Sequence, residues 1–236
     1  MESPLDPRPG QAIYTKLTLS LYDPLVLGLS NRLAWRCPSH YIQHLYDQYV
    51  STSHLEIGVG TGYFLEYCVP RQPVNNLVLF DLNRHCLQQT AERLQRFNPR
   101  IYRANVLEPF QGLDTRFESV GINYVLHCLP GTPRQKGIVF DHIKTHLKDD
   151  GVCFGATIVN READNLFSKT LKSLYNRRGI FCNRDDTAEA IESELRQRFV
   201  EVETRLIGTV FLFRARKAAA QENELPQKPK RSIRSQ

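Results

Sequence analysis

The chain of 236 residues lacks any apolar run of about 18 residues, the length that a membrane-spanning helix needs. Its N-terminus is polar and rich in proline and has no apolar core of a signal peptide. The six cysteines are scattered without a C-x-x-C pair, so the sequence indicates no zinc or other metal site. We therefore expect a cytoplasmic protein without a metal or a membrane partner, whose reduced cysteines pack as small hydrophobic residues.

Strong charge of one sign is also lacking over most of the chain. The formal net charge is +6, but residues 217–236 carry five Lys or Arg against Glu222 and Glu224, a contribution of +3. The body keeps the other +3, a weak field that disfavours nucleic acid as a partner. Residues 217–236 have too little apolar content to pack, so we expect a disordered basic tail.

The chain does contain a glycine-rich turn, at residues 58–62. An apolar run that includes Glu56 ends in three alternate glycines, Gly58, Gly60 and Gly62, where a helical pattern begins. Glycine lets the backbone turn sharply and approach a bulky ligand. Twenty-five residues after Glu56, a second apolar run ends in Asp81, whose carboxylate could hold both hydroxyls of a ribose. The pair predicts a site for a nucleotide-like cofactor.

The form E-x-G-x-G-x-G, from Glu56 to Gly62, resembles motif I of the class I S-adenosyl-L-methionine-dependent methyltransferases. The resemblance implies that this loop passes beside the methionine and ribose parts of the cofactor, and that Asp81 and the adjacent Leu82 bind the ribose. S-adenosyl-L-homocysteine would be the product. Sites for nicotinamide or flavin dinucleotides usually have the spacing G-x-G-x-x-G, which differs from the even spacing here. A glycine-rich turn without a ligand would not explain Asp81.

The order of the elements predicts an α/β fold. From residue 54 short apolar runs alternate with helical patterns, which is typical of a mostly parallel sheet with crossover helices. We expect strands at 55–57, 77–80, 101–104, 119–125 and 152–159. Two closing runs, 200–206 and 209–214, are so close in sequence that they must form an antiparallel hairpin.

Helices are expected between these strands at 39–50, from 63 to before 70, after Asn83, and at 134–147, 164–176 and 187–199. Such a sheet is known from class I methyltransferases: Rossmann-like, doubly wound and seven-stranded, mostly parallel, with a C-terminal antiparallel hairpin. We assign residues 1–50 to an N-terminal extension and helical lid, 51–216 to the cofactor-binding domain, and 217–236 to the tail.

The resemblance implies that the lid folds over the cofactor and contacts the substrate. Tyr14 and Tyr22 are candidate cofactor residues there, and Trp35 is a candidate substrate residue. Aromatic faces attract a sulfonium by cation–π interaction, worth about 0.5 to 2 kcal/mol. Simple packing of the lid explains these three side chains about as well.

Cofactors on open α/β sheets bind at the carboxyl ends of the strands. After the third strand, the resemblance implies that Asn105 bonds the adenine amino group, where the family usually has Asp, and that Val106 packs on the ring. Near the end of the fourth strand, Asn123 is a further candidate cofactor residue. His127 follows as the candidate general base, because imidazole titrates near neutrality, and as a candidate substrate residue. A satisfied core histidine is the alternative. Arg177 could bind a substrate carboxylate, or it could simply be a solvated helix end.

The runs at 35–38, 123–131 and 175–181 resemble a subgroup of small-molecule methyltransferases of fungal and bacterial metabolite pathways. We therefore predict methyl transfer to an O, N or C atom of a metabolite in secondary metabolite biosynthesis. Two alternatives stay open: a cofactor-binding cyclase or pericyclase of the same fold without methyl transfer, and an RNA methyltransferase with the tail as an arm. A homodimer is compatible with the sequence.

Overall fold

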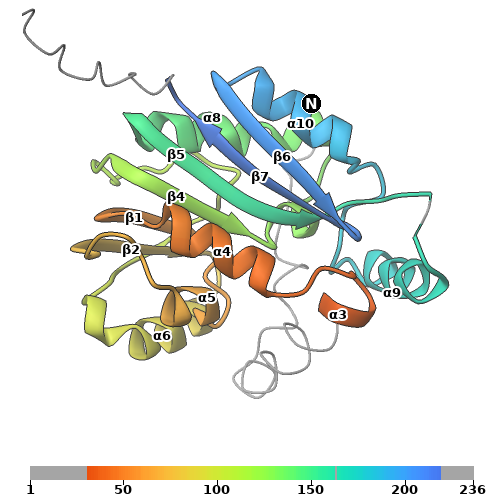
Figure 1. The fold of residues 1–236 in the computed structure, drawn as a ribbon, viewed down its shortest axis with the longest axis horizontal. Coiled ribbons are helices and arrows are strands. Elements are labelled where there is room, and N and C mark those ends of the chain that lie inside the picture. The colour runs from red at the N-terminus through yellow and green to blue at the C-terminus, as the bar shows by residue number, and fades with distance from the viewer. Residues whose placement is uncertain (1–30, 163, 219–236) are drawn as a thin grey trace, which may run out of the picture.

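The computed structural model describes residues 31–162 and 164–218, and a seven-stranded sheet forms its centre (Figure 1). The strands are β1 (Ser53–Ile57), β2 (Asn76–Asp81), β3 (Arg100–Arg103), β4 (Phe117–Asn123), β5 (Leu147–Ile158), β6 (Glu201–Ile207) and β7 (Val210–Arg216). Their order is β3-β2-β1-β4-β5-β7-β6. The first five pair in parallel, whereas β7 pairs antiparallel with both β5 and β6. The predicted sheet is confirmed.

Helices cover both faces of this sheet (Figure 1). On one face lie α4 (His40–Tyr49), α5 (Tyr63–Tyr67) and α6 (Arg84–Arg93), and on the other lie α8 (Ile138–His146) and α10 (Ala188–Arg196). The remaining elements are α3 (Asn31–Leu33), η2 (Gln95–Phe97), η3 (Leu126–Cys128), α7 (Pro133–Lys136) and α9 (Leu166–Arg177).

Two apolar cores result, one on each face, because successive side chains of a strand point to opposite sides. In β2, Leu77 and Leu79 pack into the core beneath α4, α5 and α6. Val78 and Phe80 pack into the core beneath α8 and α10. A strand buried on both faces is apolar at every central position, which is why these runs are easy to recognise in the sequence.

The predicted helix at 134–147 is wrong in one respect, since it is divided at Gly137 into α7 and α8. Thr132 and Gln135 form a capping box that starts α7 at Pro133. The chain then enters β5 at Leu147. The register shifts between the Phe117 and Ser119 pairings of β4 with β5, so residues 149–151 belong to a bulge inside this long strand.

The predicted lid residues Tyr14 and Tyr22 and the tail from residue 219 onward lie outside the described residues. Across 31–162 and 164–218, no helix is long and apolar enough to cross a membrane. The division at residues 50 and 216 stays a prediction. Helix α4, at the end of the predicted lid, packs Ile42 and Tyr46 into the core.

Candidate functional site

The loop that follows β1 turns through three glycines. Gly58, Gly60 and Gly62 have φ of +72°, +53° and +74°, a left-handed conformation that side chains disfavour. A Cβ on Gly58 would overlap Val125, and one on Gly62 would lie 2.8 Å from Thr90 Cγ2. At Gly60 a Cβ would meet no heavy atom within 4 Å, because this position faces open space. The loop therefore packs tightly on two sides and leaves its middle exposed to a ligand.

Asp81 lies at the carboxyl end of β2, beside this loop. Its Oδ1 accepts a hydrogen bond from the Asn83 backbone N–H at 2.8 Å. Burial raises the pKa of Asp81 from 3.8 to about 6, and backbone amides, including those of Asn83 and Gly60, oppose that rise. A half-buried carboxylate that can still accept hydrogen bonds suits the two hydroxyl groups of a ribose.

Asn105 and Val106 follow β3 and line the same pocket, together with Leu82. The Asn105 amide oxygen accepts from the Leu107 N–H at 3.0 Å, and its amide nitrogen donates to Glu108 Oε1 at 3.1 Å. These bonds hold the side chain at the end of the strand. One lone pair of the amide oxygen remains for a donor such as the adenine amino group.

Glu56, the last residue but one of β1, lies in a buried polar cluster. Its Oε1 accepts from the Tyr46 hydroxyl at 2.5 Å, and its Oε2 lies 3.0 Å from His54 Nε2. The amide nitrogen of Asn123, at the end of β4, donates to the Tyr46 hydroxyl oxygen at 3.1 Å. Glu56, Tyr46 and Asn123 all border the pocket. The sequence predicts Glu56 and Asn123 here, whereas Tyr46 lies in the helix expected at 39–50 and is not among the predicted site residues.

These segments enclose one pocket at the carboxyl ends of the strands, with an empty volume of about 1070 Å³ that includes solvent at its mouth. Every predicted cofactor residue within the described chain lines it: Glu56, Gly58, Gly60, Gly62, Asp81, Leu82, Asn105, Val106 and Asn123. The structure thus brings together residues from the ends of four strands. None of the described lining residues is Lys, Arg or His.

The walls fit S-adenosyl-L-methionine, the cofactor that the sequence implies. A Cβ would fill the space in front of Gly60, the Asp81 carboxylate can accept from ribose hydroxyls, and Asn123 Oδ1 is a buried acceptor without a partner among the described residues. Each of these features suits a different part of the molecule, which combines an adenine, a ribose and an amino acid.

His127, the predicted general base, lies in η3 and is not part of the pocket wall. The residue is 3% exposed, its Nδ1 accepts from the Ile158 N–H at 3.4 Å, and its ring packs 4.5 Å from that of Phe181. Burial, together with the charge of Lys136, lowers the pKa of His127 to about 3. A base must present a free nitrogen to the acceptor. Because Nδ1 accepts that N–H, the neutral ring carries its proton on Nε2, and the geometry favours the other interpretation, a core histidine.

A buried ion pair holds the segment next to His127. Lys136 Nζ donates to Asp186 Oδ2 at 2.6 Å and to the Cys182 carbonyl oxygen at 2.7 Å, and both charged side chains are at most 1% exposed. The Cys182 N–H donates to the His127 carbonyl oxygen at 2.8 Å. Burial raises the pKa of Asp186 to about 6, which the Lys136 charge opposes. These contacts fasten the region after α9 beneath η3.

The two predicted substrate residues besides His127 also lie outside the pocket wall. Trp35 is 3% exposed and packs 5.9 Å from the Phe181 ring, and its carbonyl oxygen accepts from the Thr209 N–H. Arg177 is exposed at the end of α9. Trp35 therefore has the position of a core packing residue, and Arg177 that of a solvated residue at a helix end.

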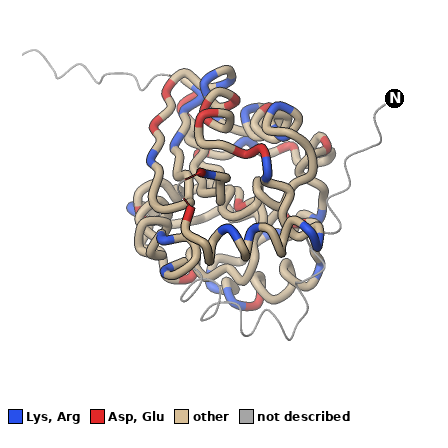
Figure 2. Tube along the Cα trace, turned by 90° about the vertical axis from the view of Figure 1, so that its right-hand side faces the viewer, with Lys and Arg blue, Asp and Glu red and all other residues tan. Residues whose placement is uncertain are grey.

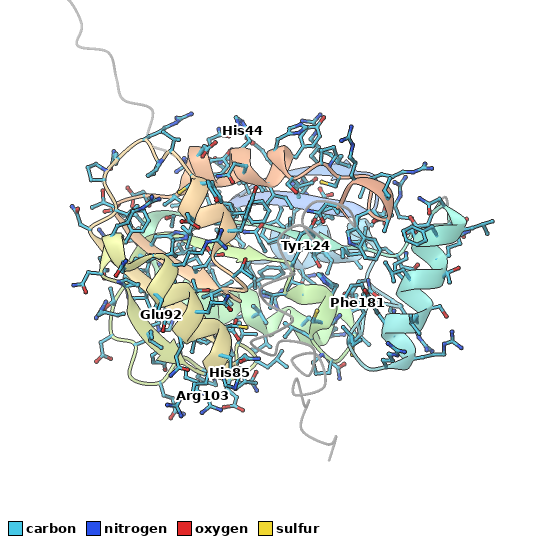
Figure 3. The ribbon with its side chains drawn as sticks, turned by 90° about the horizontal axis from the view of Figure 1, so that it is seen from below. His44, His85, Glu92, Arg103, Tyr124 and Phe181 are labelled. Atoms are coloured by element: carbon cyan, nitrogen blue, oxygen red, sulfur yellow. The ribbon has the colours of Figure 1, made fainter. Side chains whose placement is uncertain are left out.

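Tyr124 is a pocket residue that is not among those predicted from the sequence. It has φ of +56°, its hydroxyl donates to Asn31 Oδ1 at 2.9 Å, and it lines the pocket with Cys128 and Leu129. In Figure 3 it lies near the middle of the molecule, and Phe181 lies on the side towards α9. Its position directly after Asn123, at the end of a strand, was the signal available in the sequence.

Comparison with known proteins agrees with this geometry. A family model described as a methyltransferase domain matches residues 55–153. The chain is 36% identical over 207 residues to demethylluteothin O-methyltransferase of Streptomyces thioluteus, covering 87% of this chain and 90% of that protein. It is 37% identical over 211 residues to the physcion biosynthesis cluster O-methyltransferase of Aspergillus chevalieri, with coverage of 88% and 95%.

A solved structure shares the fold. The N-methyltransferase NodS from Bradyrhizobium japonicum WM9, in complex with S-adenosyl-L-homocysteine, superposes with a TM-score of 0.55 at 17% identity. The match covers 76% of this chain and 84% of that one.

Proposed function

Because this chain belongs to the class I S-adenosyl-L-methionine-dependent methyltransferases, we propose that it transfers a methyl group to an O, N or C atom of a small-molecule metabolite. The observation that carries the proposal is the single pocket that gathers Asp81, Asn105, Asn123 and the open backbone at Gly60. Secondary metabolite biosynthesis is the proposed setting, since one relative is named for a biosynthesis cluster.

Different residues of the pocket would bind different parts of the cofactor. Asp81 would accept from the ribose hydroxyls, Asn105 would meet the adenine, and the turn at Gly60 would let the backbone lie against the amino acid part. When bound, the cofactor supplies an activated methyl group whose leaving group is a neutral thioether. The chain itself must bind, orient and exclude water. Holding a nucleophile in attack geometry can supply about 7 to 11 kcal/mol.

We propose that the transfer depends on alignment and does not use His127 as a base. The aromatic ring of Tyr124 and the apolar side chain of Leu129 border the pocket, and His127 is turned into the protein behind them. An acceptor that loses its own proton readily would suit this arrangement. Both relatives described above are named O-methyltransferases, so hydroxyl groups are the first acceptors to test.

The decisive experiment measures cofactor and product together. The purified chain is incubated with S-adenosyl-L-methionine and a panel of hydroxylated aromatic metabolites, and S-adenosyl-L-homocysteine and methylated product are quantified by mass spectrometry. Equal amounts of both support the proposal. An unmethylated product that forms from the substrate without release of S-adenosyl-L-homocysteine would instead establish the cyclase alternative. Failure of the wild type to bind either cofactor form would reject the proposed function.

The RNA alternative is tested separately through the tail. In Figure 2 basic and acidic residues are interspersed over the side in view, as expected for a body of small net charge. If RNA were the substrate, deletion of residues 217–236 would weaken RNA association strongly and in a salt-dependent way. We expect the deletion to leave turnover of a small acceptor unchanged. The homodimer and the cytoplasmic location stay predictions.

A further inference from the structure

A continuous series of hydrogen bonds runs from Ser51, just before β1, to the pocket, and it is buried from Ser119 onward. The backbone N–H and hydroxyl of Ser51 donate to Ser119 Oγ at 3.1 and 2.7 Å. Ser119 Oγ lies 2.8 Å from His54 Nδ1, and His54 Nε2 lies 3.0 Å from Glu56 Oε2. Glu56 Oε1 accepts from the Tyr46 hydroxyl at 2.5 Å. These five residues form a fixed connection between the interior of the sheet and the pocket wall.

The chemistry of the groups sets the direction of this series. A carboxylate only accepts hydrogen bonds, so Tyr46 donates its one hydroxyl proton to Glu56. Burial, reinforced by Glu56, raises the pKa of the Tyr46 phenol well above its ordinary value, so the donor is retained. The phenol oxygen can then only accept a second bond, and it does so from Asn123 Nδ2 at 3.1 Å. The amide of Asn123 is thereby oriented with its oxygen away from Tyr46.

The amide oxygen of Asn123 is the last group in this series of hydrogen bonds. Asn123 is 6% exposed and lines the pocket, and its Oδ1 has no hydrogen-bond partner within the described residues. A buried acceptor without a donor is costly, and a ligand that donates to it removes that cost. Gly121 of β4 leaves room for the arrangement, since a Cβ there would overlap Glu56 Oε2 and lie 3.3 Å from His54 Cε1.

We propose that Asn123 Oδ1 accepts a hydrogen bond from the ammonium group of S-adenosyl-L-methionine, with Tyr46, Glu56 and His54 as positioning residues that aim it. This inference rests on the proposed function. The cofactor carries two cations, and only the ammonium has N–H donors, whereas the sulfonium has none. The nearby Glu56 carboxylate favours a cation on the same side of the pocket.

The sheet order supports the same placement. Asn105 follows β3, Asp81 ends β2 and Asn123 ends β4, with β1 between the last two. A ligand with its adenine at Asn105 and its ribose at Asp81 therefore extends its amino acid part towards β1 and β4. The ammonium is the donor that this part brings to Asn123.

The test compares two ligands by isothermal titration calorimetry: S-adenosyl-L-homocysteine, and its analogue in which hydrogen replaces the amino group. We expect the wild type to bind the amino compound about 10- to 100-fold more tightly, the range for a hydrogen bond to a charged group. Asn123→Leu, of similar size, should lose most of this preference and keep only the part that the Glu56 carboxylate contributes. Asn105→Leu is the matched control, which should weaken both and keep the ratio.

Tyr46→Phe tests the positioning residues, because it keeps the ring in the core but removes the oxygen that orients Asn123. The ratio should fall towards that of Asn123→Leu, and thermal unfolding verifies that each variant folds. A ratio that stays at the wild-type value in Asn123→Leu, or in Tyr46→Phe if the former does not fold, overturns the inference. So does a wild type that binds both ligands equally. Absence of all binding by the wild type would contradict the proposed function itself.

Discussion

Replacing Asp81 by Asn separates the function of this carboxylate from its effect on folding. Asp81 is the predicted acceptor for two ribose hydroxyls, and each hydrogen bond to a charged group contributes about 1.5 to 3 kcal/mol. Asn keeps one carbonyl acceptor and loses the charge, so we expect a loss of about 3 kcal/mol. That corresponds to roughly 100-fold weaker binding of S-adenosyl-L-homocysteine. Calorimetry at pH 8 measures it, with the exposed Asp114→Asn as the control.

The pH dependence follows from the raised pKa of Asp81. Burial places this pKa at about 6, and hydroxyl donors favour the ionised form, so binding must release a proton when the pH lies near 6. Below pH 6 the affinity of the wild type should fall by up to about tenfold per pH unit, since one proton is linked to binding. In Asp81→Asn this dependence should disappear.

The contribution of Asp81 to folding stability should depend on pH in the opposite direction from cofactor affinity: it should fall as the pH rises. The folded-state pKa of Asp81, about 6, lies above its ordinary value of 3.8, so the folded protein holds this proton more tightly than the unfolded chain does. Its contribution to stability is therefore present below pH 4 and is lost as the pH rises through 6. Above that, the buried charge costs on the order of 1 to 3 kcal/mol. We expect Asp81→Asn to unfold at pH 8 at a temperature no lower than the wild type. Unchanged affinity in this variant, or affinity of the wild type independent of pH from 5 to 8, would refute the reasoning.

Four further variants test other parts of the structure. Gly58→Ala forces a Cβ into a neighbouring side chain at positive φ and should lower the free energy of unfolding in urea by about 2 to 4 kcal/mol. Gly60→Ala meets no atom, so it should cost only about 1 to 2 kcal/mol and instead weaken cofactor binding; equal stability losses would contradict this difference. Lys136→Met leaves Asp186 buried without its cation and should cost about 3 to 5 kcal/mol near pH 7. Because the pKa of Asp186 is already raised by burial, this loss should shrink as acidification protonates the carboxyl, and a loss that is constant between pH 5 and 8 would count against the ion pair. His127→Gln should retain kcat and its pH profile, whereas a drop of about 10²- to 10⁴-fold would restore the role of general base.

Much of the fold and half of the site follow from local patterns of sequence. A strand buried on both faces, such as Leu77 to Phe80, needs an apolar residue at each central position, so its place and its end at Asp81 are visible in one dimension. The three glycines are visible for the same reason, since left-handed backbone is a property of single residues. Parallel strands bring their carboxyl ends to one edge, and this rule alone gathers Gly60, Asp81 and Asn105.

Tertiary packing decided which of the remaining polar residues face the pocket. Tyr46 and Asn123 are separated by 77 residues, and they meet only because α4 packs against β5, the strand next to β4. His127 looks like a base in the sequence, but packing against Phe181 and the bond from the Ile158 N–H turn it into the core. Burial, hydrogen-bond direction and pKa depend on neighbours from distant segments. The periodicity of a single segment does not indicate those neighbours. Only the folded chain therefore determines the burial, the hydrogen-bond direction and the pKa of each residue.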